Sequence, residues 1–169
     1  WSRGLGDVYK RQRLIIDANE GWTEETVRQN LLVAASIGAT VVEQPMPAGA
    51  DEILARIPHP VPVCADESVH STIDLQGICG RYDYVNVKLD KTGGLTEGVA
   101  FVREARRLGF GVMVGCMVGT SLAMAPAVLL AQTADLVDLD GPLLLARDRP
   151  NGLVYGPSLV SPPDRTLWG

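Results

Sequence analysis

Three short apolar runs in this chain each end in a carboxylate, and about one strand-plus-helix unit separates each run from the next. The runs are RLIID, TVVE and VPVCAD, which end at Asp17, Glu43 and Asp66. A fourth stretch, VNVKLDKTGG over 85–94, alternates apolar and polar residues and carries Asn86 and Lys88 on one face. Parallel strands need a crossover of a dozen or more residues, usually a helix, so this spacing predicts consecutive βαβ units.

From Arg13 onward, β-rich runs and helical periods alternate about six times. Thr23 is a suitable N-cap for the first helix, with Glu24 and Glu25 in its first turn, and Gly38 fits the residue just past its end. In the helix over 95–108, Val99, Val102 and Ala105 are expected to share one face. The expected strands are 14–16, 40–43, 61–65, 84–89, 111–115 and 136–139. The other expected helices are 51–57, 69–79 and 121–132.

Such an alternation allows either a doubly wound sheet or a (β/α) barrel. Polar groups at the ends of several strands favour the barrel, because barrel active sites are built from many strand ends whereas a doubly wound sheet concentrates its chemistry at one switch point. These polar groups are Asp17, Glu43, Asp66, Lys88 and the pair Asp138 and Asp140. We therefore expect an α/β fold that is an incomplete parallel barrel of TIM type. Since about six strands cannot close an eight-stranded barrel, the first strands are expected upstream of Arg13.

The domain organisation follows from where this pattern starts and stops. Residues 1–12, WSRGLGDVYKRQ, have no apolar period and are interpreted as a non-native, adapter-like leader. Residues 13–150 are expected to form the partial barrel, and the proline-rich residues 151–169 a C-terminal tail that packs against parts outside this sequence.

Composition narrows the class of partner. The net charge is −5 and no cluster of Lys and Arg is present, which argues against nucleic-acid and membrane partners and favours a small molecule. Cys64, Cys79 and Cys116 are odd in number and lack CxxC spacing, so free thiols in a reducing, cytoplasmic setting are expected. The longest apolar run is too short for a bilayer, which needs about 20 residues.

Carboxylates from three neighbouring strand ends suit a hard cation, since Mg²⁺ takes oxygen ligands and keeps positions open for water or substrate. We expect Asp17, Glu43 and Asp66 to hold one Mg²⁺. Each of them could instead be a helix cap or a solvated loop residue, but three at the same point of successive units favour the metal.

Lys88 lies mid-array, where a strand has no solvent face except at its mouth. We expect burial and a nearby cation to lower its pKa towards that of a general base. Asn86 shares its face and is a candidate for substrate binding, whereas Lys91 is expected in the following loop as a structural or solvent residue.

Asp138 and Asp140 are two residues apart in the last strand region and share one face. They could bind a substrate ammonium group or simply form a polar turn. Cys116 and Met117 lie beside the expected site and are further candidates for substrate contact, although Cys116 has no base nearby in sequence and packing is its simpler role. His59 and His70 are not spaced as metal ligands.

Six motifs together resemble the enolase superfamily, its muconate lactonising subgroup and, within that, the dipeptide epimerases. The motifs are DANEGW at 17–22, VEQP at 42–45, ADES at 65–68, VNVKLDKTGG at 85–94, GCMVGTSLA at 115–123 and VDLDGP at 137–142. The resemblance implies a (β/α)₇β barrel, of which about six βα units are here, and a separate capping domain. It also implies that Asp17, Glu43 and Asp66 are Mg²⁺ ligands, that Lys88 is an acid/base, and that Asp138 and Asp140 hold a dipeptide's ammonium group.

The implied reaction is epimerisation of dipeptides of the L-Ala-D/L-Glu type by 1,1-proton transfer through a metal-stabilised enediolate. The family's second lysine belongs to a KxK motif that nothing upstream of Asp17 matches, and the capping domain is also missing, so this chain alone is expected to be inactive. The alternatives are a muconate cycloisomerase or an o-succinylbenzoate synthase-like lyase, which need no ammonium site, or a non-catalytic barrel fragment. A homo-oligomer is possible for the full-length protein, and the sequence does not specify the dipeptide.

Overall fold

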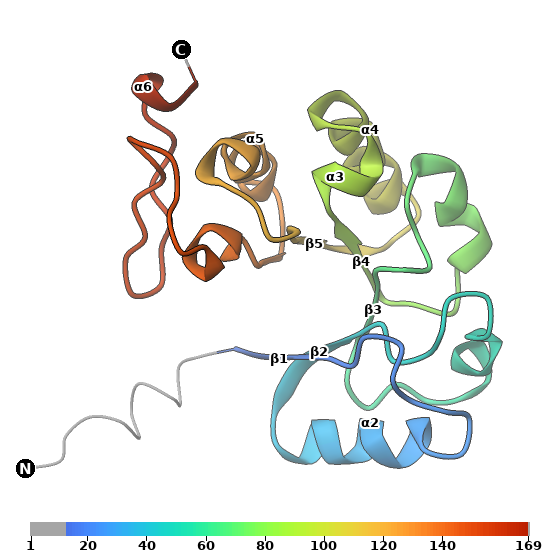
Figure 1. Ribbon diagram of the computed structural model, residues 1–169. Helices are drawn as coiled ribbons and strands as arrows, with labels where there is room; N and C mark the ends of the chain where they lie inside the picture. The colour runs from blue at the N-terminus through green and yellow to red at the C-terminus, as the bar shows by residue number, and fades with distance from the viewer. Residues whose placement is uncertain (1–12, 169) are drawn as a thin grey trace, which may run out of the picture.

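The computed structural model describes residues 13–168, which form a sheet of six parallel strands curled into a half-barrel, with helices on its outer side (Figure 1). Strands adjacent in the sheet are also consecutive in sequence, from β1 to β6. The strands are β1 (Leu14–Asp17), β2 (Ala39–Glu43), β3 (Val63–Ala65), β4 (Tyr84–Val87), β5 (Gly111–Val114) and β6 (Leu136–Val137). The predicted partial barrel of TIM type is confirmed, while the expected leader over 1–12 lies outside the described residues.

The helices follow the strands in the expected alternation, and three of those in the described residues are 3₁₀ helices of four to seven residues. The α-helices are α2 (Val27–Ser36), α3 (Leu89–Thr92), α4 (Leu95–Arg107), α5 (Ser121–Ala131) and α6 (Arg165–Trp168). The 3₁₀ helices are η1 (Glu52–Arg56), η2 (Thr72–Ile78) and η3 (Gly141–Leu144).

The first helix starts later than its cap signal predicts. Thr23 instead begins a turn, in which its carbonyl accepts from the backbone N–H groups of Thr26 and Val27 at 3.1 and 2.9 Å. The two threonine side chains also contact each other, so α2 begins at Val27 with no side-chain cap. Val27 and Leu31 then recur at helical spacing and are buried against the sheet.

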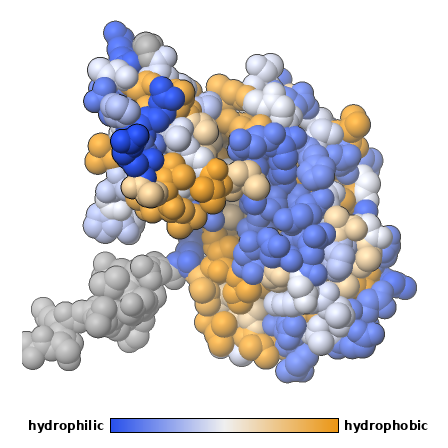
Figure 2. Space-filling view, viewed as in Figure 1, coloured by the Kyte–Doolittle hydropathy of each residue, from blue (hydrophilic) through white to orange (hydrophobic). Residues whose placement is uncertain are grey.

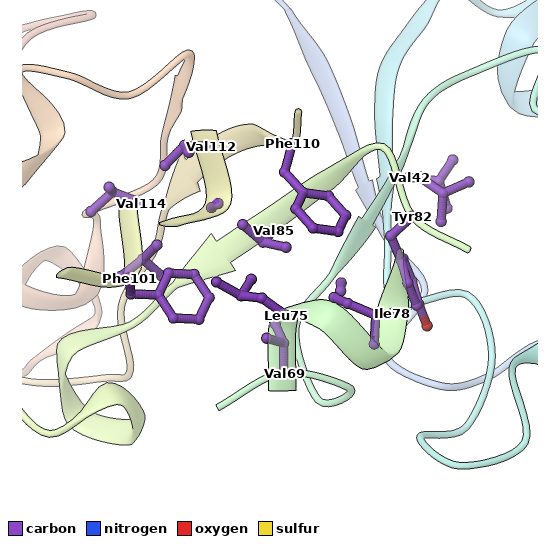
Figure 3. Close-up of a cluster of buried hydrophobic side chains, with 14 of the residues drawn as sticks. Val42, Val69, Leu75, Ile78, Tyr82, Val85, Phe101, Phe110, Val112 and Val114 are labelled. Atoms are coloured by element: carbon purple, nitrogen blue, oxygen red, sulfur yellow. The ribbon is translucent and has the colours of Figure 1, made fainter. Parts of the chain in front are cut away.

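The main core fills the space between the sheet and the outer helices (Figure 3). Phe101 from α4 and Leu75 from η2 lie beside Val85 of β4, and each of the three is at most 1% exposed. Full burial of one such side chain contributes about 1.5–3 kcal/mol. The buried face of α4 includes Phe101, Val102 and Ala105, whereas Val99, expected to share a face with the last two, is 44% exposed.

A second, smaller core lies on the inner face of the sheet. Val41, Cys64, Met113 and Leu136 form a separate buried cluster, although Val42, next to Val41, belongs to the main core. Because successive side chains of a strand point to opposite faces, this cluster marks the inner side of the half-barrel.

The C-terminal segment packs onto the last units rather than only onto parts outside this sequence. The Tyr155 hydroxyl donates to the Leu139 carbonyl at 2.7 Å, and the Leu153 backbone N–H donates to Ser121 Oγ at 2.8 Å. Figure 2 shows apolar surface over this C-terminal part and again beside α2. Within residues 13–168, no helix is long and apolar enough to cross a bilayer.

Candidate active site

The register of the strands brings the predicted polar groups to one end of the inner face. Asp17 pairs with Glu43, and Glu43 pairs with Cys64, which belongs to the inner cluster. Neighbours in register on parallel strands share a face, so Asp17 and Glu43 point into the half-barrel. Asp66 follows Cys64 by two residues and lies at the same end.

Glu43 is a buried carboxylate with one firm partner. Glu43 is only 4% exposed, and Asn86 Nδ2 donates a hydrogen bond to its Oε1 at 2.6 Å. Burial raises the pKa of Glu43 to about 7; the hydrogen bond from Asn86 works against this, and the negative charges of Asp66 and Asp17 add to it. Excess negative charge is therefore concentrated where β1, β2 and β3 end.

Asp66 is held by two lysines. Lys88 Nζ donates to Asp66 Oδ2 at 2.6 Å, and Lys91 Nζ donates to the other carboxylate oxygen and, at 2.6 Å, to the Asp66 carbonyl. Burial would raise the pKa of Asp66, but the two lysines outweigh it and lower that pKa. Lys91 lies in α3 and not in a loop, and its contact with a predicted metal ligand was missed. Its spacing of three residues from Lys88, across a helix start, was the available signal.

Lys88 lies one residue past β4, at the cap of α3, and not inside a strand. Burial alone would lower its pKa, but the hydrogen bond and charge of Asp66, followed by the charge of Glu43, raise that pKa above its usual value. The lowering expected from burial and a cation is thus opposed by an anionic partner, Asp66, which that expectation left out.

The other candidates for substrate contact differ in exposure. Asn86 is 1% exposed and contacts Glu43, and its Oδ1 is buried without a hydrogen-bond partner among the described residues. Met117 is 56% exposed and Cys116 is half-buried. Burial raises the pKa of the Cys116 thiol, and the charges of Asp138 and Asp140 raise it further.

Asp138 belongs to the same mouth from the far side of the sheet. Its backbone N–H donates to the Val114 carbonyl at 2.9 Å, which extends the β5–β6 pairing beyond β6. Burial raises the pKa of Asp138, as does the charge of Asp140, while Lys88 works against both. The charge of Lys88 therefore acts on Asp138 as well as on Glu43.

Comparison of the sequence with known protein families shows which family this chain belongs to. The profile of the family described as "Enolase C-terminal domain-like" matches residues 4–144. The chain belongs to this family. The predicted membership of the enolase superfamily is confirmed.

Two curated relatives have the same sequence identity to this enolase-family chain, over matches of different length. It is 48% identical over 165 residues to N-acetyl-D-glutamate racemase from Pseudoalteromonas sp, covering 98% of the chain and 52% of that protein. It is also 48% identical over 135 residues to L-Ala-D/L-Glu epimerase from Escherichia coli (strain K12), covering 80% of the chain and 42% of that protein. The chain therefore spans about half the length of these relatives.

One solved structure matches nearly the whole chain. It is the crystal structure of an enolase family member from Agrobacterium tumefaciens with homology to dipeptide epimerases, with bound sodium and L-Ala-L-Glu. Its sequence is 60% identical and its TM-score is 0.93, over 96% of this chain and 50% of that one.

The chemistry of the donors fits the hard cation that the family implies. Asp17, Glu43 and Asp66 offer only oxygen ligands, and the unpartnered Asn86 Oδ1 adds a buried acceptor beside Glu43. As they stand, no three His, Cys, Asp or Glu side chains of residues 13–168 are grouped closely enough to form a metal site. Asp66 is instead turned towards Lys88 and Lys91, which compensate its charge.

Proposed function

We propose that this chain is the barrel portion of a Mg²⁺-dependent epimerase of dipeptides of the L-Ala-D/L-Glu type. The observation that carries the proposal is the common inner face of the half-barrel. There Lys88 is in contact with Asp66 and in electrostatic reach of both Glu43 and Asp138. The Lys88 ammonium group therefore lies among carboxylates. Such an arrangement suits a site that binds a zwitterionic substrate and moves a proton at one of its carbon atoms.

The roles of the chain's own residues follow from their positions. Asp17, Glu43 and Asp66 would hold the cation, and Mg²⁺ supplies Lewis-acid stabilisation of negative charge on the substrate carboxylate. Lys88 would move the proton at the α-carbon. Asp138 and Asp140 would bind the ammonium group of the dipeptide and orient that carbon towards Lys88 Nζ.

A second candidate is supported by the other relative of equal identity, which is named for racemisation of N-acetyl-D-glutamate. Both named substrates contain glutamate, and both reactions invert an α-carbon. An N-acetylated amino acid carries no ammonium group, so Asp138 and Asp140 would have no cation to bind in that reaction.

The test is hydrogen exchange in D₂O with the full-length protein, supplied separately with L-Ala-L-Glu and N-acetyl-L-glutamate. Deuterium uptake at the α-carbon of the dipeptide, lost on removal of Mg²⁺ with EDTA and regained when Mg²⁺ is added back, is the expected result. Uptake with neither substrate would refute both candidates.

Asp138→Asn and Asp140→Asn separate the alternatives. For a dipeptide epimerase we expect KM to rise about tenfold or more in each variant, because a hydrogen bond to a charged group contributes about 1.5–3 kcal/mol. Unchanged activity in both variants would favour the N-acylamino acid reaction, or a lyase such as a muconate cycloisomerase or an o-succinylbenzoate synthase. Mg²⁺ affinity without exchange on any substrate would indicate a non-catalytic barrel.

We also propose a cytoplasmic location, supported by three cysteines that are all free thiols in the described residues. We propose in addition that the full-length protein forms a homo-oligomer, which a measurement of its molecular mass in solution would test.

A further inference from the structure

A buried polar network lies directly behind the strand ends that carry Glu43 and Asp66. Its central residue is Gln44, which has no exposed surface and comes directly after Glu43. The φ angle of Gln44 is +31°, a conformation that favours glycine and is strained for other residues. A strained backbone at a fully buried amide persists only where the surrounding contacts hold it.

The Gln44 amide holds the backbone of the next strand end. Its Oε1 accepts from the backbone N–H of Asp66 at 2.8 Å and from that of Ser68 at 3.2 Å. Its Nε2 faces three acceptors, namely the Met46 carbonyl and Ser68 Oγ, both at 2.8 Å, and the Tyr82 hydroxyl at 3.0 Å. The amide is therefore fully used on both sides, and it fixes the direction in which the chain leaves β3.

Asp51 anchors the far side of this network. Its side chain has no exposure, and its Oδ2 accepts from Ser68 Oγ at 2.6 Å and from the Tyr82 hydroxyl at 2.7 Å. Its other oxygen accepts from the Arg81 guanidinium. The buried charge is thus compensated, and the network joins the loop after β2 to the loop before β4.

Gln44 also fixes the strand end from its own backbone. Its N–H donates to the Cys64 carbonyl at 2.9 Å, and its carbonyl accepts from the Glu20 N–H at 2.8 Å. Gln44, which directly follows Glu43, therefore contacts both the loop that follows Asp17 at the end of β1 and the chain around Asp66 at the end of β3.

We infer that Gln44 is a positioning residue that aims Glu43 and Asp66 into the inner face of the half-barrel, so that both can bind the cation. The inference rests on the proposed function, because it concerns the ligands proposed there. Residues that orient metal ligands typically change metal affinity by 10–100-fold when they are replaced.

The experiment compares Gln44→Met with Gln29→Met in the full-length protein. Methionine keeps the length of the side chain and removes both its donors and its acceptor, whereas Gln29 is an exposed residue of α2 and serves as the matched control. Mg²⁺ affinity is measured by isothermal titration calorimetry, and backbone hydrogen exchange around Asp66 by mass spectrometry. We expect Gln44→Met to weaken Mg²⁺ binding by about tenfold or more and to speed exchange at Asp66 and Ser68, and Gln29→Met to change neither.

The outcomes separate this inference from the proposed function. Folded Gln44→Met protein that is less stable but binds Mg²⁺ as tightly as the control would overturn the inference and leave the proposed function standing. Failure of the unmodified protein to bind Mg²⁺ would remove both. If Gln44→Met does not fold, Ser68→Ala takes its place, since it removes one of the two hydroxyls that join the Gln44 amide to Asp51 and leaves that of Tyr82. Several-fold weaker Mg²⁺ binding is then expected, and unchanged affinity would overturn the inference.

Discussion

Replacement of Arg81 by methionine should destabilise the fold, because it removes the cation that pairs with the buried Asp51 carboxylate. The Asp51 side chain has no exposed surface, and the Arg81 side chain is 21% exposed. Methionine retains most of the aliphatic packing of arginine, so the change isolates the charge. Ser68 and Tyr82 still donate to Asp51 in the variant.

The size of the effect follows from how much compensation remains. Removal of one partner from a buried ion pair costs about 3–5 kcal/mol where the other charge is left uncompensated. Since two hydroxyl donors remain on Asp51, we expect a loss of about 2–3 kcal/mol for Arg81→Met. For a unit of 150–250 residues, that corresponds to a fall in Tm of about 4–12 °C.

Thermal unfolding followed by circular dichroism at pH 7 measures this loss in the full-length protein. Arg107→Met is the matched control, because Arg107 pairs with Glu104 on the surface of α4 and its side chain is 64% exposed. Exposed pairs of this kind contribute little, so the control should change Tm only slightly. The double variant Arg81→Met with Asp51→Asn should recover part of the loss, because the buried charge is gone. Equal losses in Arg81→Met and the control, or no recovery in the double variant, would refute the argument.

Three further predictions test the core, the mouth and the pH dependence. Phe101→Ala should cost about 3–5 kcal/mol in urea denaturation, because it empties the centre of the main core, and a loss below about 1 kcal/mol would contradict that placement. Gly141→Ala should lower kcat/KM by about 10–100-fold with a smaller effect on Tm, since its new Cβ would lie 2.7 Å from the Met117 carbonyl and push that loop aside; wild-type kinetics would count against it. His59→Gln should lower Tm more at pH 5.5 than at pH 8.5. The hydrogen bond to Asp83 raises the pKa of His59 in the folded protein. The stabilisation of the fold by protonated His59 is therefore complete below its unfolded-state pKa of about 6.5, and it is lost as the pH rises through its folded-state pKa. Equal losses of Tm at both pH values would contradict this role of His59.

Much of the fold could be predicted from the sequence because it depends on local periodicity. The alternation of short apolar runs with helical stripes places every strand, and parallel strands that follow one another through helices must all end on the same side of the sheet. That rule alone brings Asp17 and Glu43 together, and the structure pairs them in register. It needs no knowledge of packing between distant residues.

Element boundaries were less predictable, because they depend on local hydrogen bonds that compete with the helix. Thr23 looks like a cap, but its carbonyl is used in a turn with Thr26, which delays α2. Lys88 looks like a strand residue, yet its carbonyl accepts from the backbone N–H of Thr92 at 3.0 Å, which begins α3 immediately after β4. In both cases a backbone carbonyl made a contact that residue type does not specify.

The site shows the same division, since charge placement was predictable and charge partners were not. The sequence placed Lys88 near the carboxylates, but its pKa depends on which oxygen its amine reaches. Contact with Asp66 at 2.6 Å reverses the direction that burial alone predicts. Such a contact joins residues more than twenty positions apart, and no local pattern contains it.

Glu43 and Gln44 show how one strand end can serve both the site and its support. Glu43 points to the inner face and meets Asn86, whereas Gln44 points the other way and meets Ser68 and Tyr82. Because side chains alternate along a strand, insertion of a single residue within β2 would turn Glu43 to the outer face and move its carboxylate towards the buried network. The carboxylate would then lie next to Asp51 without a cation of its own, which costs far more than an amide there. The order Glu43–Gln44 is therefore required by both sides of the sheet, because the inner face needs the carboxylate and the buried network needs the amide.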